Sequence, residues 1–187
     1  MEPVTGIVLA GGLGRRMGGV DKGLQPLHGK PMVGEVLARL APQVSEIVIN
    51  ANQNRAAYEK FGHRVVADDI AGFAGPLAGL HAGLKAARNA LVVTVPCDSP
   101  FLPADLVLRL KNELKQNDLA VAKTGDQPHP VFALVRRNLL ENLEKFLLQG
   151  GRKIDAWYAS LKYVEVLFDD EADAFRNINT LDELNRE

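Results

Sequence analysis

The stretch VLAGGLGRRMGGVDKG, residues 8–23, includes the end of a short apolar run and decides how the rest of the chain is interpreted. Its glycines allow the backbone to approach an anion closely, and successive N–H groups in such a loop form a nest for the anion's oxygens. Arg15, Arg16 and Lys22 add positive charge to the same loop. The stretch therefore predicts a loop that holds a nucleoside triphosphate, with a flexible turn of solvated arginines as the structural alternative.

Two familiar phosphate-binding loops do not match this stretch. A dinucleotide-binding fingerprint that starts at Gly12 and Gly14 would need glycine or alanine where Met17 stands. A P-loop in the following residues would need glycine at Leu24 and a serine or threonine at Pro31. The loop therefore belongs to neither motif, although it shares their glycines and their main-chain N–H groups that can bind an anion.

Apolar runs alternate with segments of helical periodicity along the first half of the chain. The runs are rich in valine and isoleucine and are predicted as buried parallel strands at residues 6–10, 46–51, 63–67 and 90–95. Helices are predicted between them at residues 32–40, 54–61 and 77–87. This alternation indicates βαβ units with right-handed crossovers, and so an α/β fold of three layers with helices on both faces of a sheet.

The second half of the chain is expected to extend the same sheet as a mixed portion. A helix is predicted over residues 102–114, with Pro103 in its first turn. The later elements are predicted as strands at 120–123, 129–135 and 161–168 and a helix at 138–148. Because 187 residues without a repeat or linker suit one core, we expect a single domain over residues 1–187.

The composition narrows the classes of function. Hydrophobic residues make up 47% of the chain, and no apolar stretch approaches the length that crosses a bilayer. The net charge of -1 gives no global basic surface, so no nucleic-acid or membrane partner is expected. Cys97 is the single cysteine, which excludes an internal disulfide and a thiolate-rich zinc site. The first residues show no signal-peptide pattern, so we expect a cytoplasmic protein.

Asp98 stands where the apolar run at 90–95 ends, in the segment VTVPCDSPF. Pro96 and Pro100 restrict the backbone on both sides and hold this carboxylate at a set place on the edge of the sheet. Mg²⁺ prefers oxygen ligands and is often bound by one or two carboxylates beside substrate phosphates. Asp98 is therefore a candidate metal ligand, or else a turn aspartate bonded to its own backbone.

Polar residues also follow two other predicted strands. Asn50 and Asn52 end one of them, and Asp68 and Asp69 end the next. Because open α/β sheets bind ligands beyond the carboxyl ends of their strands, these residues are candidates for contact with a ligand. Turn formation would explain either pair equally well.

Three further features are open to a structural explanation as well as a functional one. Gly75 precedes Pro76, which suits the first position of a helix. His129 lies between two prolines. Asn177 and Asn179 stand just before a capping box that begins at residue 180 and would open a last helix.

Seven segments taken together closely resemble the molybdenum cofactor guanylyltransferases. They are LAGGLGRRMGGVDKG, GKP, NAN, GPLAG, PCDSP, HPVFAL and NINT, in consistent order from about residue 5 to about residue 185. The first and fifth also occur in looser form across related nucleotidyltransferases, whereas PCDSP and HPVFAL in so short a chain narrow the resemblance. It implies the nucleotidyltransferase fold, a Rossmann-like and mostly parallel sheet with helices on both faces.

The resemblance also implies a reaction and a set of site residues. GMP would pass from MgGTP to the terminal phosphate of molybdopterin or its molybdenum form, with release of pyrophosphate. The residues implied in catalysis are Arg15, Arg16, Lys22 and Asp98, with Asp98 as ligand of Mg²⁺. Those implied at the nucleotide are Leu9, Ala10, Gly11, Gly12, Lys22, Asn50, Asp68, Gly75 and Asp98. Those implied on the pterin side are His129, Asn177 and Asn179.

Such a reaction needs no nucleophile from the protein. A phosphate oxygen of the pterin attacks the α-phosphorus of GTP in line, and this oxygen is already anionic, so a general base is dispensable. The sequence agrees, because it offers no Ser-His or paired-carboxylate constellation. Cofactor-insertion and chaperone proteins of molybdoenzymes are further partners that the resemblance implies.

Three other functions compete with this interpretation. A cytidylyltransferase would act on the same pterin or on a small alcohol phosphate, but such relatives tend to carry alanine at the position of Gly11 and lack the Pro-Cys-Asp sequence. A non-catalytic nucleotide-binding or regulatory domain would not need the carboxylate of Asp98 together with Lys22. A purely structural module leaves the cations of the glycine-rich loop unexplained.

Overall fold

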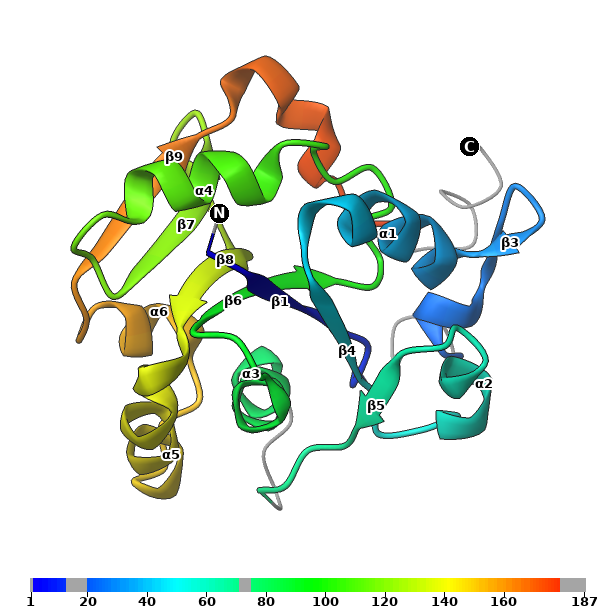
Figure 1. The fold of residues 1–187 in the computed structure, drawn as a ribbon, viewed down its shortest axis with the longest axis horizontal. Coiled ribbons are helices and arrows are strands. Elements are labelled where there is room, and N and C mark those ends of the chain that lie inside the picture. Colours follow the sequence, from blue (N-terminus) through cyan, green and yellow to red (C-terminus); the bar gives the residue numbers. More distant parts are fainter. Residues whose placement is uncertain (1, 13–19, 71–74, 179–187) are drawn as a thin grey trace.

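A seven-stranded sheet forms the centre of the computed structural model, which describes residues 2–12, 20–70 and 75–178. The strand order is β5-β4-β1-β6-β8-β7-β9 (Figure 1). The strands are β1 (Val4–Leu9), β4 (Glu46–Asn50), β5 (Arg64–Val66), β6 (Leu91–Pro96), β7 (Leu119–Thr124), β8 (Gln127–Arg136) and β9 (Tyr163–Leu167). A separate ribbon pairs β2 (Pro26–Leu27) with β3 (Lys30–Pro31).

The two halves of this sheet differ in strand direction. β5, β4, β1 and β6 are mutually parallel, as the alternation of strands and helices predicts. β8 runs antiparallel to both β6 and β7, and β9 pairs in parallel with β7. The mostly parallel sheet with a mixed later portion is therefore confirmed.

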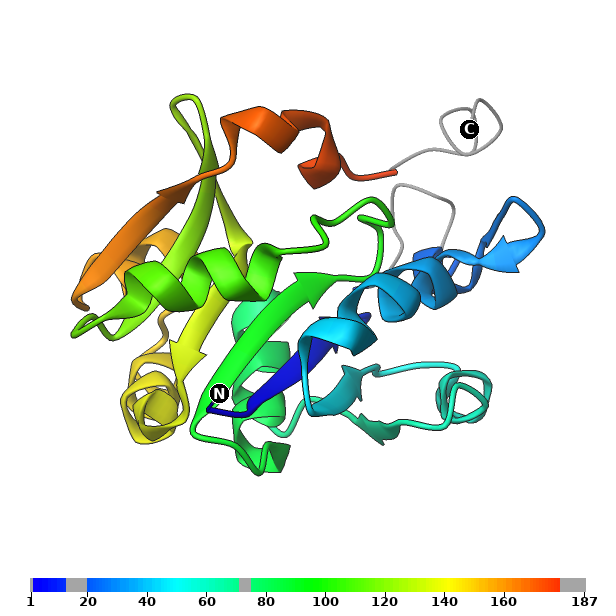
Figure 2. The same cartoon turned by 45° about the horizontal axis from the view of Figure 1, so that its top comes forward.

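Helices cover both faces of the sheet, which gives the predicted three layers (Figures 1 and 2). One face carries α1 (Met32–Leu40) and α4 (Leu106–Leu114). The other carries α3 (Pro76–Ala86), α5 (Leu140–Leu148) and the short α6 (Ile154–Tyr158), and α2 (Arg55–Glu59) lies beside β5. Short 3₁₀ turns complete the order: η2 (Lys22–Leu24), η3 (Ala41–Gln43), η4 (Arg137–Leu139) and η5 (Asp169–Phe175).

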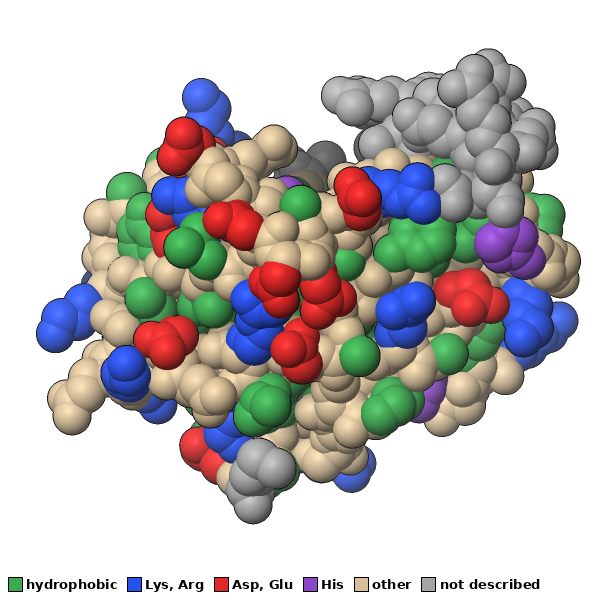
Figure 3. All heavy atoms as spheres, turned by 90° about the horizontal axis from the view of Figure 1, so that it is seen from above, with side chains coloured by type: hydrophobic (Ala, Val, Ile, Leu, Met, Phe, Trp, Pro, Cys, Tyr) green, Lys and Arg blue, Asp and Glu red, His purple; other side chains and the backbone are tan. Residues whose placement is uncertain are grey.

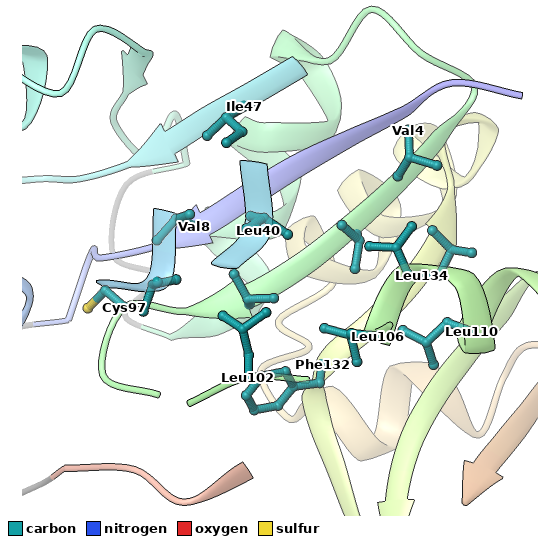
Figure 4. Packing of buried hydrophobic residues seen from close by; sticks show 14 of the residues in the cluster. Val4, Val8, Leu40, Ile47, Cys97, Leu102, Leu106, Leu110, Phe132 and Leu134 are labelled. Carbon is teal, nitrogen blue, oxygen red and sulfur yellow. The ribbon is translucent and has the colours of Figure 1, made fainter. Parts of the chain in front are cut away.

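The core has two layers because neighbouring side chains of a strand point to opposite faces of the sheet. Val8 packs into the layer beneath α1 and α4, whereas Ile7 packs into the layer beneath α3. Figure 4 shows the first layer, in which Leu40 and Leu106 reach the sheet from the two helices. Both β1 side chains are fully buried, so the strand before the glycine-rich loop is held from both sides.

The helix predicted over residues 102–114 begins later, at Leu106, so the placement of Pro103 in its first turn is wrong. The side chain of Gln43, which comes from the segment after α1, explains the boundary. Its Nε2 donates to the main-chain oxygen of Pro103 (2.9 Å), and its Oε1 accepts from the main-chain N–H of Val107 (3.0 Å). A distant side chain thus satisfies an N–H of the first turn that has no partner inside the helix.

The described surface carries charges of both signs. Figure 3 shows basic and acidic side chains interspersed on the described part of the face that carries α1 and α4. Within the described residues, no helix is both long and apolar enough to cross a membrane.

Candidate functional site

Four parallel strands end together at one edge of the sheet. Leu9, at the end of β1, lies opposite Asn50 of β4 and Pro96 of β6, and Asn50 lies opposite Val66 of β5. Backbone hydrogen bonds continue beyond the strands, from the N–H of Ala10 to the oxygen of Asn50 (2.8 Å). The polar residues that follow these strands are therefore neighbours, as expected for parallel strands whose carboxyl ends meet at one edge of a sheet.

Lys22 and Asp98 meet at this edge. Lys22 opens η2, Asp98 follows β6, and Nζ of the lysine lies 3.2 Å from Oδ2 of the aspartate. Their side chains are 20% and 15% exposed, so water screens this ion pair less than a pair on the open surface. Two residues separated by 76 positions in the sequence form one charged pair.

Within the described part of the chain, the side chains that hold Asp68 are neutral amides. Its Oδ1 accepts a hydrogen bond from Nδ2 of Asn50, and its Oδ2 accepts one from Nδ2 of Asn52, both at 2.9 Å. Oδ1 of Asn52 in turn accepts from the main-chain N–H of Asp68 (2.9 Å). Asn50 is 2% exposed, so it supports this carboxylate from beneath. The amides fix the orientation of Asp68 without neutralising its charge.

The glycine-rich loop rests on the same asparagines. Nδ2 of Asn52 donates to the main-chain oxygen of Gly11 (3.2 Å). A Cβ atom at Gly11 would lie 2.8 Å from Oδ1 of Asn50 and 2.9 Å from Nδ2 of Asn52, which is closer than such atoms approach. At Gly12 a Cβ would meet none of the described atoms within 4 Å. A side chain at Gly11 would thus displace these two amides, whereas no described atom opposes a side chain at Gly12.

Gly75 lies at the start of α3, the helix that approaches Asn50. It is the N-cap residue, with φ of 145°, a conformation that favours glycine, and Pro76 takes the first helical position as predicted. One turn further, Gly79 faces Oδ1 of Asn50 with no room for a side chain. The start of α3 is therefore close to the group of Asp68, Asn50 and Asn52, called the Asp68 cluster below. Asp69 is directed elsewhere and accepts a hydrogen bond from Nζ of Lys85 (2.6 Å).

The last described residues hold the turn that carries Asp98. The main-chain N–H of Ile178 donates to the main-chain oxygen of Asp98 (2.8 Å), and Oγ of Ser99 donates to Oδ1 of Asn177. The guanidinium of Arg176 lies 4.2 Å from the centre of the Phe101 ring. Asn177 is thus brought next to the Asp98 turn.

His129 lies on β8, and η5 packs against it. Its ring stacks on Phe175, with centroids 4.6 Å apart and planes 12° apart. Nε2 of the imidazole is 2.7 Å from Oγ1 of Thr124, and burial lowers the pKa of His129. Because Asn177 follows Phe175 by two residues, η5 links the two described residues that were predicted on the pterin side.

The chain also matches known proteins. A family model described as the MobA-like NTP transferase domain matches residues 6–164. The chain belongs to this family. A molybdenum cofactor guanylyltransferase from Cupriavidus necator is 54% identical over 190 residues, covering 98% of this chain and 95% of the relative. A relative of the same name from Shewanella putrefaciens is 49% identical over 182 residues, covering 96% and 93%.

A solved structure gives the same result for the fold. The crystal structure of molybdopterin-guanine dinucleotide biosynthesis protein A from Archaeoglobus fulgidus matches with a TM-score of 0.80 and 30% identity, covering 97% of this chain and 95% of that chain. The MobA-like family and this match confirm the predicted nucleotidyltransferase fold.

Some predicted residues of this MobA-like transferase lie outside the described part of the chain. They are Arg15, Arg16 and Asn179, together with the capping box that begins at residue 180. Cys97, next to Asp98, is described and buried. Burial, followed by the nearby charge of Asp98, raises the pKa of this thiol and keeps it protonated.

Sequence reasoning missed a group of residues behind Lys22. Asp21 is contacted by Asn54 and Tyr58, which lie more than thirty positions along the chain. Asp21 adjoins Lys22 in the glycine-rich stretch, and this adjacency was the one available signal. Ser99 was missed for the same reason, since its partner Asn177 comes from the far end of the described chain.

Proposed function

We propose that this chain transfers GMP from GTP to the terminal phosphate of molybdopterin or molybdenum-loaded molybdopterin, forming the guanine dinucleotide cofactor and releasing pyrophosphate. The observation that carries the proposal is the pair of Lys22 and Asp98, 3.2 Å apart at the carboxyl edge of the sheet. A cation for phosphates and a carboxylate for a metal are the two groups that nucleotidyl transfer requires. The guanylyltransferase names of relatives about half identical to this chain support the choice of GTP.

Asp98 fits a magnesium ion that is bound together with substrate. Among the described residues, no group of three or more histidine, cysteine or acidic side chains gathers to hold a metal alone. Mg²⁺ usually takes one or two protein carboxylates and completes its shell with phosphates and water, which suits a single aspartate. The chemistry it supplies when bound is neutralisation of charge on the α-phosphoryl group and on pyrophosphate.

The reaction exchanges one P–O bond for another. An oxygen of the pterin phosphate forms a bond to the α-phosphorus of GTP, the bond from that phosphorus to the bridging oxygen breaks, and pyrophosphate leaves with the electron pair. Lys22 would contact the phosphates of GTP, and Arg15 and Arg16 would add charge to the same loop. Because the attacking oxygen is anionic, the protein's contribution is to position the two substrates.

The Asp68 cluster is the proposed place of the guanosine. The oxygens of Asp68 are oriented by Asn50 and Asn52. A carboxylate held in this way suits a group that presents N–H donors, and guanine offers N1–H and the N2 amino group. Leu9 to Gly12 would border the base, with Gly75 at the start of α3 beside them.

On the pterin side we propose His129, Asn177 and Asn179. His129 and Asn177 are linked by η5, and Asn177 contacts the turn of Asp98. This proximity supports a path from the pterin phosphate to the metal site. We also propose a cytoplasmic location, which suits the unpaired Cys97.

The direct test incubates the purified chain with Mg²⁺, molybdopterin and each nucleoside triphosphate in turn. We expect pyrophosphate and a dinucleotide product only when the triphosphate is GTP. Asp98→Asn is expected to form the product far more slowly. Asp69→Asn makes the same charge change at a residue paired with Lys85 and is expected to keep the normal rate. Product from CTP in place of GTP would make the chain a cytidylyltransferase, and GTP binding without product would make it a binding domain.

A further inference from the structure

Asp21, the residue before Lys22, is held by side chains from α2 and its N-cap. Oη of Tyr58, in α2, donates to Oδ1 of Asp21 (2.5 Å), and Nδ2 of Asn54 donates to Oδ2 (3.1 Å). Nε2 of Gln25 donates to the main-chain oxygen of Asp21 (3.1 Å). Both carboxylate oxygens and the carbonyl therefore have donors, and the backbone is fixed on the side where Lys22 begins.

Tyr58 is built to donate this hydrogen bond. Its side chain is fully buried. Burial, followed by the nearby Cys97 and the hydrogen bond to Asp21, raises the pKa of Tyr58 above its ordinary value. The phenol keeps its proton at any physiological pH. A buried hydroxyl without a partner is costly, so Tyr58 and Asp21 depend on each other.

The residue after Lys22 is confined as well. A Cβ atom at Gly23 would lie 2.6 Å from Oη of Tyr58 and 3.3 Å from Sγ of Cys97. Gly23 therefore rests directly on these two side chains. Cys97 lies at the end of the core layer seen in Figure 4 and immediately precedes Asp98. One surface thus supports the backbone at Lys22 and adjoins the backbone at Asp98.

We propose that Asp21, Tyr58 and Asn54 are positioning residues that hold the ammonium group of Lys22 at the place of the nucleotide phosphates. They act through Lys22 and do not themselves touch the substrate. This inference rests on the proposed function in one respect, because it takes Lys22 as a contact of the GTP phosphates. A purely structural role would instead stabilise the fold and affect every ligand to the same degree.

The test compares the affinities for GTP and for guanosine, measured by calorimetry with Mg²⁺ present. Tyr58→Phe removes one hydroxyl, and Asn54→Gly removes one donor at a residue whose φ of 51° glycine adopts freely. We expect each variant to lower the affinity for GTP by about 10-fold. The affinity for guanosine should fall by less than about 2-fold, because guanosine carries no phosphate. Asn54→Gly also answers the question if Tyr58→Phe does not fold.

Tyr158→Phe is the matched control. Tyr158 is also buried, and its Oη donates to the main-chain oxygen of Pro130 (2.7 Å), in the core layer on the opposite face of the sheet from α1 and α4. Loss of the Tyr158 hydroxyl is expected to lower the free energy of unfolding, as loss of the Tyr58 hydroxyl should. Unlike Tyr58→Phe, Tyr158→Phe should leave the affinity for GTP unchanged.

A double-mutant cycle with Lys22→Ala completes the test. Because the positioning residues act through Lys22, Tyr58→Phe is expected to cause no further loss of GTP affinity once the lysine is absent. Equal losses for GTP and guanosine, or an undiminished effect of Tyr58→Phe in the Lys22→Ala background, would overturn the inference. If Lys22→Ala leaves GTP affinity intact, the phosphate role of Lys22 in the proposed function fails and the inference falls with it.

Discussion

Two carboxylates stand at the same edge of the sheet, and their surroundings differ. Asp68 accepts hydrogen bonds from two neutral amides, and its own N–H is bonded to one of them. Asp98 faces the ammonium group of Lys22. Among the described residues, Asp68 is oriented by neutral amides, whereas Asp98 is paired with a cation.

The difference favours a different partner for each carboxylate. An oriented carboxylate suits a directional contact with the N–H groups of a base. A carboxylate paired with a lysine suits a place where several charges meet, because a metal and phosphates bring both signs at once. We therefore assign Asp98 to the reacting phosphates and Asp68 to the nucleoside.

The largest expected effect lies at Asp98. Asp98→Asn should lower turnover by about 10²- to 10³-fold, because a neutral amide holds Mg²⁺ poorly beside the reacting phosphate. The melting temperature should change little, since the turn is also held through the main-chain oxygen of Asp98. Steady-state kinetics and thermal unfolding measure the two quantities. Turnover close to that of the unaltered chain would remove Asp98 from the metal site.

Asp68→Asn should act on the nucleoside instead. An asparagine here turns an N–H₂ group toward one of the amides that now donate to Asp68, so that one hydrogen bond is lost and two donors face each other. We expect the affinity for guanosine to fall by roughly 100-fold, equivalent to about 3 kcal/mol. Calorimetry with guanosine checks this expectation, with Asp69→Asn as the matched control. An unchanged affinity would move the base away from Asp68.

Gly11→Ala should disturb the support beneath Asp68. The added Cβ would lie within 3 Å of atoms of both Asn50 and Asn52, so these amides must shift. We expect use of GTP to fall by one to two powers of ten, or roughly 1–3 kcal/mol, with little gain for CTP. Competition assays with both nucleotides measure the change. Full activity with GTP would show that the placement of these asparagines does not matter for the base.

The smallest effect is expected at Asn52, an exposed side chain that joins Gly11 to Asp68. Asn52→Ala removes these hydrogen bonds while Asn50 still holds the other oxygen of Asp68. The affinity for guanosine should fall by about 3- to 10-fold. Gln53→Ala, at the exposed neighbouring residue, is the control. A loss as large as that of Asp68→Asn would make Asn52 itself the contact of the base.

The elements that could be predicted are those that local patterns determine. α1 covers the predicted residues 32–40, because its apolar positions recur at helical spacing. The start of α4 was misplaced because Gln43, more than sixty positions away, caps it. α6 and η5 are too short to carry a period, so they were not predicted. That residues 1–187 form one domain stays a prediction.

The site could be predicted as a place but not as a set of contacts. Parallel strands bring their carboxyl ends together, so Asn50, Asp68 and Asp98 were expected at one edge from the sequence. Which oxygen accepts from which amide depends on the register of β1, β4 and β5. The contact between Tyr58 and Asp21 likewise depends on how α2 packs. Single-sequence patterns carry no information on either.

The most direct test of the two assignments is calorimetry of guanosine and GTP, over a range of Mg²⁺ concentrations, on the unaltered chain, Asp98→Asn and Asp68→Asn. We predict that Asp98→Asn loses the part of the GTP affinity that depends on Mg²⁺ and binds guanosine normally. Asp68→Asn should lower the affinities for guanosine and GTP by the same factor, and the GTP affinity should still depend on Mg²⁺. If both variants weaken both ligands alike, the two carboxylates do not divide the nucleotide between them and the account is wrong.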